Sequence, residues 1–140
     1  MIRKANNKDI NELSELNEHS LSHIDWAYDK THIRNTLKSG NYFVYVIDNK
    51  IVGSIKVYLE HNWVWINTIS VHKDYRRQGI GSKLIKYIIK RAKRLYYDKV
   101  VLYTDTNATH NKGFYEKLGF IEVERKRERK HMWVKFEKII

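Results

Sequence analysis

The 140-residue chain has no cysteine, no proline and only six glycines. Without cysteine it has no disulfide, no thiolate metal ligand and no cysteine nucleophile. It also lacks an apolar run long enough to cross a membrane and the apolar segment of a signal peptide. We therefore expect a soluble protein in the cytoplasm, with no membrane partner.

Acidic residues are scarce as well: 16 Asp and Glu stand against 27 Lys and Arg, a net charge of +11. Such an excess is typical of proteins that bind nucleic acid, a membrane surface or an acidic small molecule. Residues 124–130 concentrate charge but alternate its sign, which predicts a solvated hairpin. The length and the 42% of hydrophobic residues suit a single domain over residues 1–140.

Periodicity predicts a mixture of strands and helices. Runs rich in aromatic and β-branched residues predict strands over residues 2–5, 42–47, 51–59, 63–71, 99–104, 120–125 and 131–139. Apolar residues at helical spacing predict helices over residues 7–19, 31–38, 80–95 and 111–118. Asp9 with Glu12 forms a candidate capping box for the first helix, and Asn6 is the alternative cap.

The order of these elements predicts the fold class. The helix over residues 80–95 separates the fourth and fifth strands, and such a crossover joins parallel strands. Short turns join the other neighbours as antiparallel hairpins. We therefore expect an α/β fold of the α+β kind, in which helices flank a mixed, mostly antiparallel central sheet.

One turn carries the clearest functional signal. The sequence RRQGIG at residues 76–81 links an apolar strand to an amphipathic helix. Its glycines allow a ligand to approach the backbone closely, and the first amides of the following helix have no intrahelical acceptor. Two arginines add positive charge. The pattern predicts an anion-binding turn.

This turn resembles the acetyl-CoA pyrophosphate loop of the GNAT superfamily of N-acetyltransferases, which reads Arg/Gln-x-x-Gly-x-Gly/Ala. The stretch FYEKLGF at residues 114–120 resembles a second motif of that family and follows at the expected distance. The resemblance implies the GNAT fold, with its fourth and fifth strands splayed apart. It also implies an acyltransferase that moves an acetyl group from acetyl-CoA, as donor substrate, to a primary amine by direct attack in a ternary complex. No metal is implied.

The resemblance assigns roles to particular residues. Backbone amides of residues 78–82 would hold the pyrophosphate, and residues 69–71 would pair with the pantetheine arm. Asn107 or Asn111 would contact that arm too, although their spacing to Tyr115 departs from the family pattern. The implied cofactor-binding residues are Ile69, Ser70, Val71, Arg76, Arg77, Gln78, Gly79, Ile80, Gly81, Ser82, Asn107 and Asn111.

Tyr115 matches the family tyrosine that lies near the coenzyme sulfur, which makes it the candidate catalytic acid. A phenol has an unperturbed pKa of about 10 and can donate a proton to a thiolate at neutral pH. A purely structural role, in which Tyr115 packs against Phe114, is the alternative.

The sequence does not reveal the acceptor or the general base. Family members often carry Glu or His on the fourth strand, where this chain has Trp65 and Asn67. Candidate bases are Glu60, His61, His23 and Asp25, each of which is also a plausible surface residue. Candidate acceptor-binding residues are Trp26, Trp65 and Asn67, with Trp63 as a further residue of the same slot. Core packing is the alternative for the aromatic side chains.

Other nucleotide-binding motifs do not fit. Leu84 stands where a Rossmann fingerprint needs a small residue, and Gly81-Ser82-Lys83 inverts the order of a P-loop. The alternative function is a non-catalytic acyl-CoA-binding or nucleic-acid-binding module on the same fold. A small-molecule or protein amine is favoured over nucleic acid as the partner, and a homodimer is left open.

Overall fold

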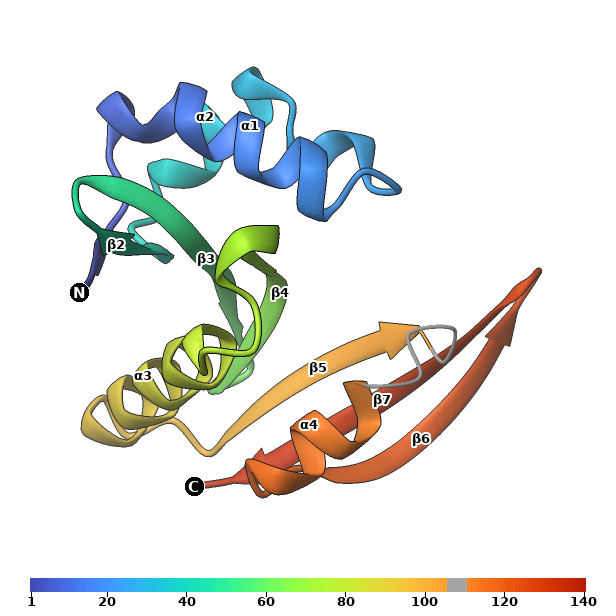
Figure 1. The fold of residues 1–140 in the computed structure, drawn as a ribbon. Coiled ribbons are helices and arrows are strands. Elements are labelled where there is room, and N and C mark those ends of the chain that lie inside the picture. The colour runs from blue at the N-terminus through green and yellow to red at the C-terminus, as the bar shows by residue number, and fades with distance from the viewer. Residues whose placement is uncertain (106–110) are drawn as a thin grey trace. The chain divides into compact units, whose positions relative to one another are not determined.

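The computed structural model describes residues 1–105 and 111–140, which form a mixed α/β fold with one seven-stranded sheet (Figure 1). The strands are β1 (Ile2–Lys4), β2 (Tyr42–Ile47), β3 (Lys50–Glu60), β4 (Trp63–Val71), β5 (Lys99–Asp105), β6 (Ile121–Glu128) and β7 (His131–Ile139). The helices are α1 (Ile10–Ser20), α2 (Lys30–Leu37), α3 (Ile80–Arg94) and α4 (Asn111–Lys117). The short 3-10 turns are η1 (Asn7–Asp9), η2 (Asp25–Ala27) and η3 (Lys73–Tyr75).

The strands follow the order β1-β2-β3-β4-β5-β7-β6 across the sheet. β4 and β5 run parallel, while β1 with β2, β2 with β3, β5 with β7 and β6 with β7 run antiparallel. The parallel pairing joins residues 63–66 to residues 99–102, whereas β4 continues to Val71 and β5 to Asp105. The predicted fold class is therefore confirmed.

The chain forms two compact units, each of which is described by itself. The first unit is Met1–Val57 with Asn67–Ile85, and the second is Tyr58–Ile66 with Lys86–Ile140. The single domain over residues 1–140 remains a prediction. Within residues 1–105 and 111–140, every helix is too short or too polar to span a bilayer.

One core cluster of the first unit lies between α1, α2 and the strands β2 and β3. Its buried residues are Ile10, Leu13, Leu16, Ile33, Tyr42, Val44 and Ile51. Asn17 shares the buried face of α1, where its amide nitrogen donates to the Ala27 carbonyl at 2.8 Å and to the Tyr42 hydroxyl at 2.9 Å. The helix predicted over residues 7–19 is thus confirmed as η1 followed by α1.

Asn6, the alternative cap, caps η1, the 3-10 turn that leads directly into α1. The Asn6 side chain accepts from the Lys8 amide at 2.9 Å, and Asp9 accepts from the Asn6 amide at 2.8 Å, so these two residues form the capping box. Asp9 also binds both terminal nitrogens of Arg3. Glu12, the other predicted box residue, instead accepts a bond from the Ile51 amide at 2.6 Å. The box of Asp9 with Glu12 was therefore wrong, because this carboxylate serves a strand 39 residues away.

In the second unit α4 packs against β7, where the ring centroids of Tyr115 and Phe136 lie 5.5 Å apart. Leu102 of β5 pairs with Phe136 of β7, and both are buried. β6 runs to Glu128, three residues past its predicted end, and the turn of its hairpin with β7 places Arg129 at φ +56°. Most of β6 is exposed, which confirms the solvated hairpin predicted for residues 124–130.

Candidate functional site

The predicted anion-binding turn connects the end of β4 to the start of α3 within the first unit. The His72 amide donates to the Val52 carbonyl at 2.8 Å, which ties the end of β4 to β3. The Nδ1 atom of His72 then accepts from the Asp74 amide at 3.1 Å and caps η3. The turn therefore starts from a braced strand end.

Two residues bend the backbone of this turn into the left-handed region, Arg77 at φ +64° and Gly79 at φ +79°. The first hydrogen bond of α3 runs from the Lys83 amide to the Gly79 carbonyl at 2.9 Å. The amides of residues 80–82 come before this bond and have no intrahelical acceptor. Amides at the start of a helix, with the helix dipole behind them, attract phosphate. The backbone thus has the geometry that the predicted turn requires.

The surroundings of this turn are open and positively charged. A Cβ atom built on Gly79 would meet no heavy atom within 4 Å. Arg76, Arg77 and Gln78 are exposed. The Nε of Arg76 donates to the Val71 carbonyl at 3.3 Å, which holds this guanidinium near the end of β4. Exposed guanidinium groups beside free amides suit a phosphate ligand.

The start of α3 lies close to β3 because residue 53 is glycine. A Cβ atom there would lie 2.9 Å from Cγ2 of Ile80, 3.2 Å from Cδ1 of Leu84 and 3.3 Å from the carbonyl oxygen of Ser70. Any larger residue would push the first turn of the helix away from the sheet. Gly53 thereby sets the position of the amides that open α3.

Residues 69–71, predicted to bind a ligand through their backbone, form the end of β4. The Ser70 hydroxyl is buried, lies 2.7 Å from the Ser54 hydroxyl and donates to Oδ1 of Asn17 at 3.0 Å. Its side chain therefore belongs to the core. The Val71 carbonyl accepts the arginine bond described above, so only part of this backbone is open to a ligand.

Tyr115, the candidate acid, lies on α4 in the second unit and is 6% exposed. Its ring centroid lies 5.1 Å from that of Phe114, 6.0 Å from that of Phe120 and 5.5 Å from that of Phe136. Burial among these rings raises the pKa of Tyr115 to about 12. The phenol therefore stays protonated at neutral pH and is a weaker acid than an exposed tyrosine.

For the two candidate asparagines, the side chains fall outside the part of the chain that the structure describes. Asn107 lies outside the described residues. Asn111 begins α4, and its side chain also lies outside the described part of the chain. Their contact with the pantetheine arm stays a prediction.

Trp26, a candidate acceptor-binding residue, lies in η2 and is 40% exposed. The Nζ of Lys56, on β3, lies 4.8 Å from its ring centroid and 3.2 Å from Nε2 of His32. Lys56 is only 8% exposed, and burial lowers its pKa to about 8. Burial and the nearby ammonium group also lower the pKa of His32. Sequence reasoning missed Lys56, because a lysine in a strand is normally expected to face solvent.

Replacing Lys56 by methionine tests this burial. Between pH 8 and the ordinary lysine value of 10.5, the unfolded chain holds a proton that the folded chain has lost, so the wild type gains stability as pH rises. We expect the wild type to gain on the order of 2 kcal/mol relative to Lys56→Met between about pH 7.5 and about pH 9.5, measured by urea unfolding. Lys56 also affects His32, but the pKa of His32 is lowered from 6.5 and its ring is neutral throughout this pH window, so its titration adds little to the difference. Lys50→Met, at an exposed position of the same strand, is the control; an equal change in both variants would contradict the assignment.

Trp65 stands in a row of aromatic side chains in the second unit. Its ring centroid lies 5.8 Å from that of Tyr58 and 6.2 Å from that of Tyr103, both of which are exposed. The Nζ of Lys135 lies 5.4 Å from the Trp65 centroid. The indole Nε1 is buried and has no hydrogen-bond partner among the described residues. Buried polar groups normally have a hydrogen-bond partner, so this donor is open to an acceptor atom from outside the described residues.

The candidate general bases are scattered over exposed positions. Glu60 and His61 lie 3.2 Å apart and are both well exposed. His23 and Asp25 are exposed as well. Asn67, the remaining candidate acceptor residue, is exposed on β4. No contact within the described part of the chain singles out one of these residues, so the base stays unassigned.

Comparison with known proteins agrees with this fold. The chain matches the model of the acetyltransferase (GNAT) family over residues 8–120, and it belongs to that family.

Three known proteins illustrate the likeness. Streptothricin acetyltransferase A of Bacillus subtilis (strain 168) is 34% identical over 82 residues, which cover 56% of this chain and 46% of that protein. N-alpha-acetyltransferase 30 of Dictyostelium discoideum is 41% identical over 61 residues, covering 44% of this chain and 33% of that protein. The chain thus matches less than half the length of either relative. The crystal structure of PaiA N-acetyltransferase from Thermoplasma acidophilum, in complex with coenzyme A, shares the fold with a TM-score of 0.83 and 18% identity, over 96% of each chain.

Proposed function

We propose that the chain transfers an acetyl group from acetyl-CoA to a primary amine by direct attack in a ternary complex. One observation carries the proposal: a member of the GNAT family has a left-handed turn that opens three helix-terminal amides beside two exposed arginines. The coenzyme A complex of a protein with the same fold supports acetyl-CoA as the donor.

The turn of the first unit would hold the donor. Amides of residues 80–82 bind pyrophosphate oxygens, and Arg76 and Arg77 add charge. Free backbone groups at the end of β4 pair with the pantetheine amides as an added strand would. A β4 amide near Ile69 or Ser70 donates to the thioester oxygen. This oxygen gains charge in the transition state, which is where such a donor is most effective.

The reaction itself exchanges one bond for another. The amine nitrogen attacks the thioester carbon, and collapse of the resulting tetrahedral species breaks the bond between carbon and sulfur. The amine releases a proton to water or to a basic side chain. The thiolate gains a proton, for which Tyr115 is the proposed source.

The surroundings of Tyr115 refine this role. A phenol with a pKa of about 12 holds its proton more tightly than a thiol with an ordinary pKa of about 8.5. Its hydrogen bond to the departing sulfur is therefore the main part of the role that burial supports. If the proton passes completely to the sulfur, solvent must return a proton to the Tyr115 phenolate.

Release of free coenzyme A thiol tests the function. Acetyl-CoA is incubated with the chain and a panel of amines: peptides with free N-termini, N-terminally blocked peptides with an internal lysine, polyamines and streptothricin. We expect one class to raise thiol release above the acceptor-free rate, with acetylated product seen by mass spectrometry. The same acceptors with dimethylated amines are the controls.

The alternative function gives a different result. A protein that binds acetyl-CoA tightly but releases no thiol with any amine would be an acyl-CoA-binding module. A protein that binds oligonucleotides at physiological salt, but not acetyl-CoA, would be a nucleic-acid-binding module. Non-specific attraction to phosphates fades steeply as salt rises, so the salt concentration matters.

A further inference from the structure

Lys56 is a buried amine that the proposed reaction leaves unused. It stands on β3 within the first unit and is 8% exposed. Lysine is rarely buried without a carboxylate that balances its charge. In the part of the chain that the structure describes, no carboxylate pairs with Lys56, and burial is what lowers its pKa to about 8. Near this pH, a large share of the amine is therefore in its neutral, nucleophilic form.

Aromatic rings and an imidazole surround the amine in place of an acid. The Nζ of Lys56 lies 4.8 Å from the ring centroid of Trp26 in η2 and 5.9 Å from that of Tyr42 in β2. It also lies 3.2 Å from Nε2 of His32 in α2. Asp29, which caps α2, only partly opposes the lowering of the His32 pKa by burial and by Lys56. His32 is thus neutral near pH 8, and its Nε2 can accept a proton from the amine when the ring proton is on Nδ1.

A purely structural role does not account for this arrangement. A methionine would fill a similar space without the cost of burying an amine. The contact with the Trp26 ring offsets only part of the desolvation, since the pKa of Lys56 still falls to about 8. Desolvation of this kind is one of the ways in which proteins activate a lysine as a nucleophile.

The sheet places Lys56 near the proposed donor site of the same unit. Lys56 pairs with Tyr42 and Ser54 pairs with Val44 in unbroken register, so both side chains of β3 lie on one face. The Ser54 hydroxyl lies 2.7 Å from that of Ser70, at the end of β4. Two residues of a strand span about 7 Å, which separates Lys56 from this contact along β3. The amine thus belongs to the same face of the sheet as the Ser54–Ser70 contact.

The cover over the amine is thin. Trp26 belongs to a 3-10 turn of three residues, Asp25–Ala27, and is itself 40% exposed. Movement of this one surface side chain would open Lys56 to a small reagent. Exposed side chains change rotamer on the nanosecond scale or faster, so such openings are frequent.

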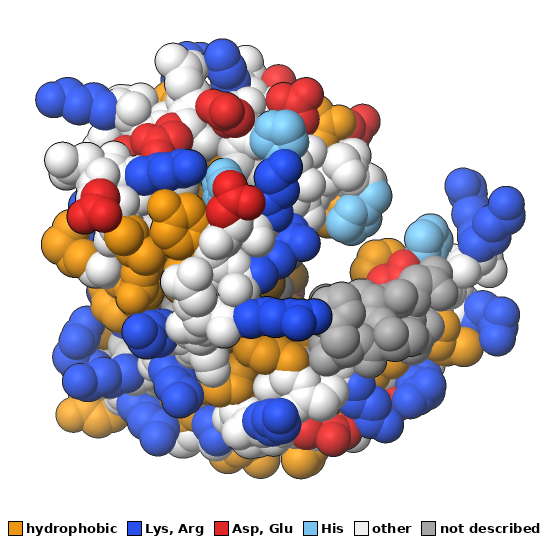
Figure 2. Space-filling model, viewed as in Figure 1, with side chains coloured by type: hydrophobic (Ala, Val, Ile, Leu, Met, Phe, Trp, Pro, Cys, Tyr) orange, Lys and Arg blue, Asp and Glu red, His pale blue; other side chains and the backbone are white. Residues whose placement is uncertain are grey.

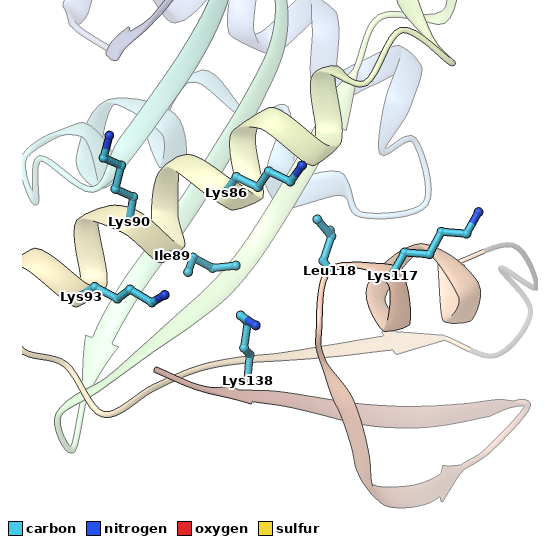
Figure 3. Close-up of a pocket in the computed structure, with 7 residues that line it drawn as sticks. All are labelled: Lys86, Ile89, Lys90, Lys93, Lys117, Leu118 and Lys138. Carbon is cyan, nitrogen blue, oxygen red and sulfur yellow. The ribbon is translucent and has the colours of Figure 1, made fainter.

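Other lysines of the chain have a different environment. Figure 2 shows many Lys and Arg side chains on the molecular surface. In the second unit, five lysines line a cavity of about 340 Å³ (Figure 3), and four of them, Lys86, Lys90, Lys93 and Lys117, are exposed. Water around an ammonium group favours its charged form, which is not a nucleophile. These residues therefore provide an internal comparison for Lys56.

We propose that Lys56 is an acyl acceptor within the chain itself, whose amine takes an acetyl group from a thioester and becomes an N-ε-acetyllysine. The nitrogen forms a bond to the acyl carbon, and the bond between carbon and sulfur breaks. The nitrogen loses a proton to Nε2 of His32, which passes it to solvent. The sulfur leaves as a thiolate with the electron pair and takes up a proton from water. This step goes beyond the proposed function, because it needs neither a foreign amine nor the phosphates of a coenzyme.

Pulse labelling with S-acetyl-N-acetylcysteamine, a thioester without phosphates, tests the proposal. Mass spectrometry after proteolysis gives the initial rate of acetylation at each lysine, between about pH 6.5 and about pH 9.5. At pH 8, an amine with a pKa of about 8 is about half neutral, whereas one with the ordinary value of 10.5 is only about 0.3% neutral. We expect Lys56 to react at least about tenfold faster than the exposed Lys50 on β3 and Lys90 on α3. The rate at Lys56 should level off above about pH 8, whereas the rates at Lys50 and Lys90 should still rise.

Replacement of His32 by glutamine tests the proton acceptor. We expect acetylation of Lys56 to slow by about tenfold, which is less than a typical general-base contribution because solvent also accepts protons. His19→Gln, at an exposed position of α1, is the matched control and should change the rate by less than about twofold. Urea unfolding shows that both variants are folded. Equal rates at Lys56 in the two variants would overturn the role of His32.

Two results would overturn the modification site itself. One is labelling of Lys56 no faster than Lys50 and Lys90, and the other is labelling of Lys56 only after unfolding in urea. The outcome is separate from that of the proposed function. A protein that releases no thiol with the amine panel, but labels Lys56 as expected, would lose the proposed function and keep this site. An active enzyme with unlabelled Lys56 would show the reverse.

Discussion

Replacement of Gly79 by asparagine is expected to lower the affinity for acetyl-CoA by about a hundredfold while the protein stays folded. Asparagine tolerates the left-handed backbone found at this position, so the turn can persist. Its side chain would occupy the open space above residue 79, through which a phosphate must approach the amides of residues 80–82. Loss of two charge-assisted hydrogen bonds at roughly 1.5 kcal/mol each gives this magnitude. Titration calorimetry with acetyl-CoA measures it.

Gly40 provides the matched control for backbone strain. It has φ +73°, and a Cβ atom there would make only an ordinary contact, 3.7 Å from Nζ of Lys4. Gly40→Asn and Gly79→Asn should lose similar stability, about 1 kcal/mol or less, but only the second should lose affinity. Unchanged affinity in folded Gly79→Asn would show that the turn does not hold the pyrophosphate. Gly81→Val, which adds bulk within the first turn of α3, should then also bind normally.

Local sequence patterns were enough to predict the strand, the turn and the helix that carry this site. The strand, glycine turn and helix around residues 71–81 are each specified by residues close in sequence, and so is the crossover that makes β4 and β5 parallel. The ends of the helices were predicted less accurately, because a side chain that can cap a helix can also bond to several other partners. Asn6 and Glu12 show this. The Asn6 side chain accepts from the Lys8 amide and caps the turn before α1, whereas the Glu12 carboxylate accepts from the Ile51 amide on β3.

The sequence alone could not predict how the tertiary environment acts on individual residues. Nothing local marks Lys56 as buried, because its burial arises from Trp26 and His32 on segments that fold over β3. Arg77 likewise adopts a left-handed conformation that no feature of arginine demands. The pKa of Tyr115 depends on burial against rings that include Phe136, which lies 21 residues later in the chain on β7, a strand paired with both β5 and β6. Such effects are visible only after the fold has brought distant residues together.

The roles of the Tyr115 ring and of its hydroxyl can be tested apart, because one substitution removes the hydroxyl and keeps the buried ring. Tyr115→Phe keeps the contacts with Phe114, Phe120 and Phe136 but removes the proposed donor to the leaving sulfur. We expect the turnover number to fall by about a hundredfold, the typical size of such a contribution, while acetyl-CoA affinity changes little. Pre-steady-state measurements should confirm that chemistry limits the rate in both proteins.

The pH profile of the wild type adds a second readout for Tyr115. Since burial raises the pKa of this phenol to about 12, it remains protonated up to about pH 11, and no alkaline loss of turnover below that pH should come from it. The raised pKa also means that its contribution to stability is complete below about pH 10 and is lost progressively between about pH 10 and about pH 12. Tyr42→Phe is the matched control: it removes another buried hydroxyl, bonded to Asn17 at 2.9 Å, and should lower stability by about 1 kcal/mol without lowering turnover. Equal turnover in Tyr115→Phe and wild type would leave Tyr115 a packing residue and make solvent the proton source.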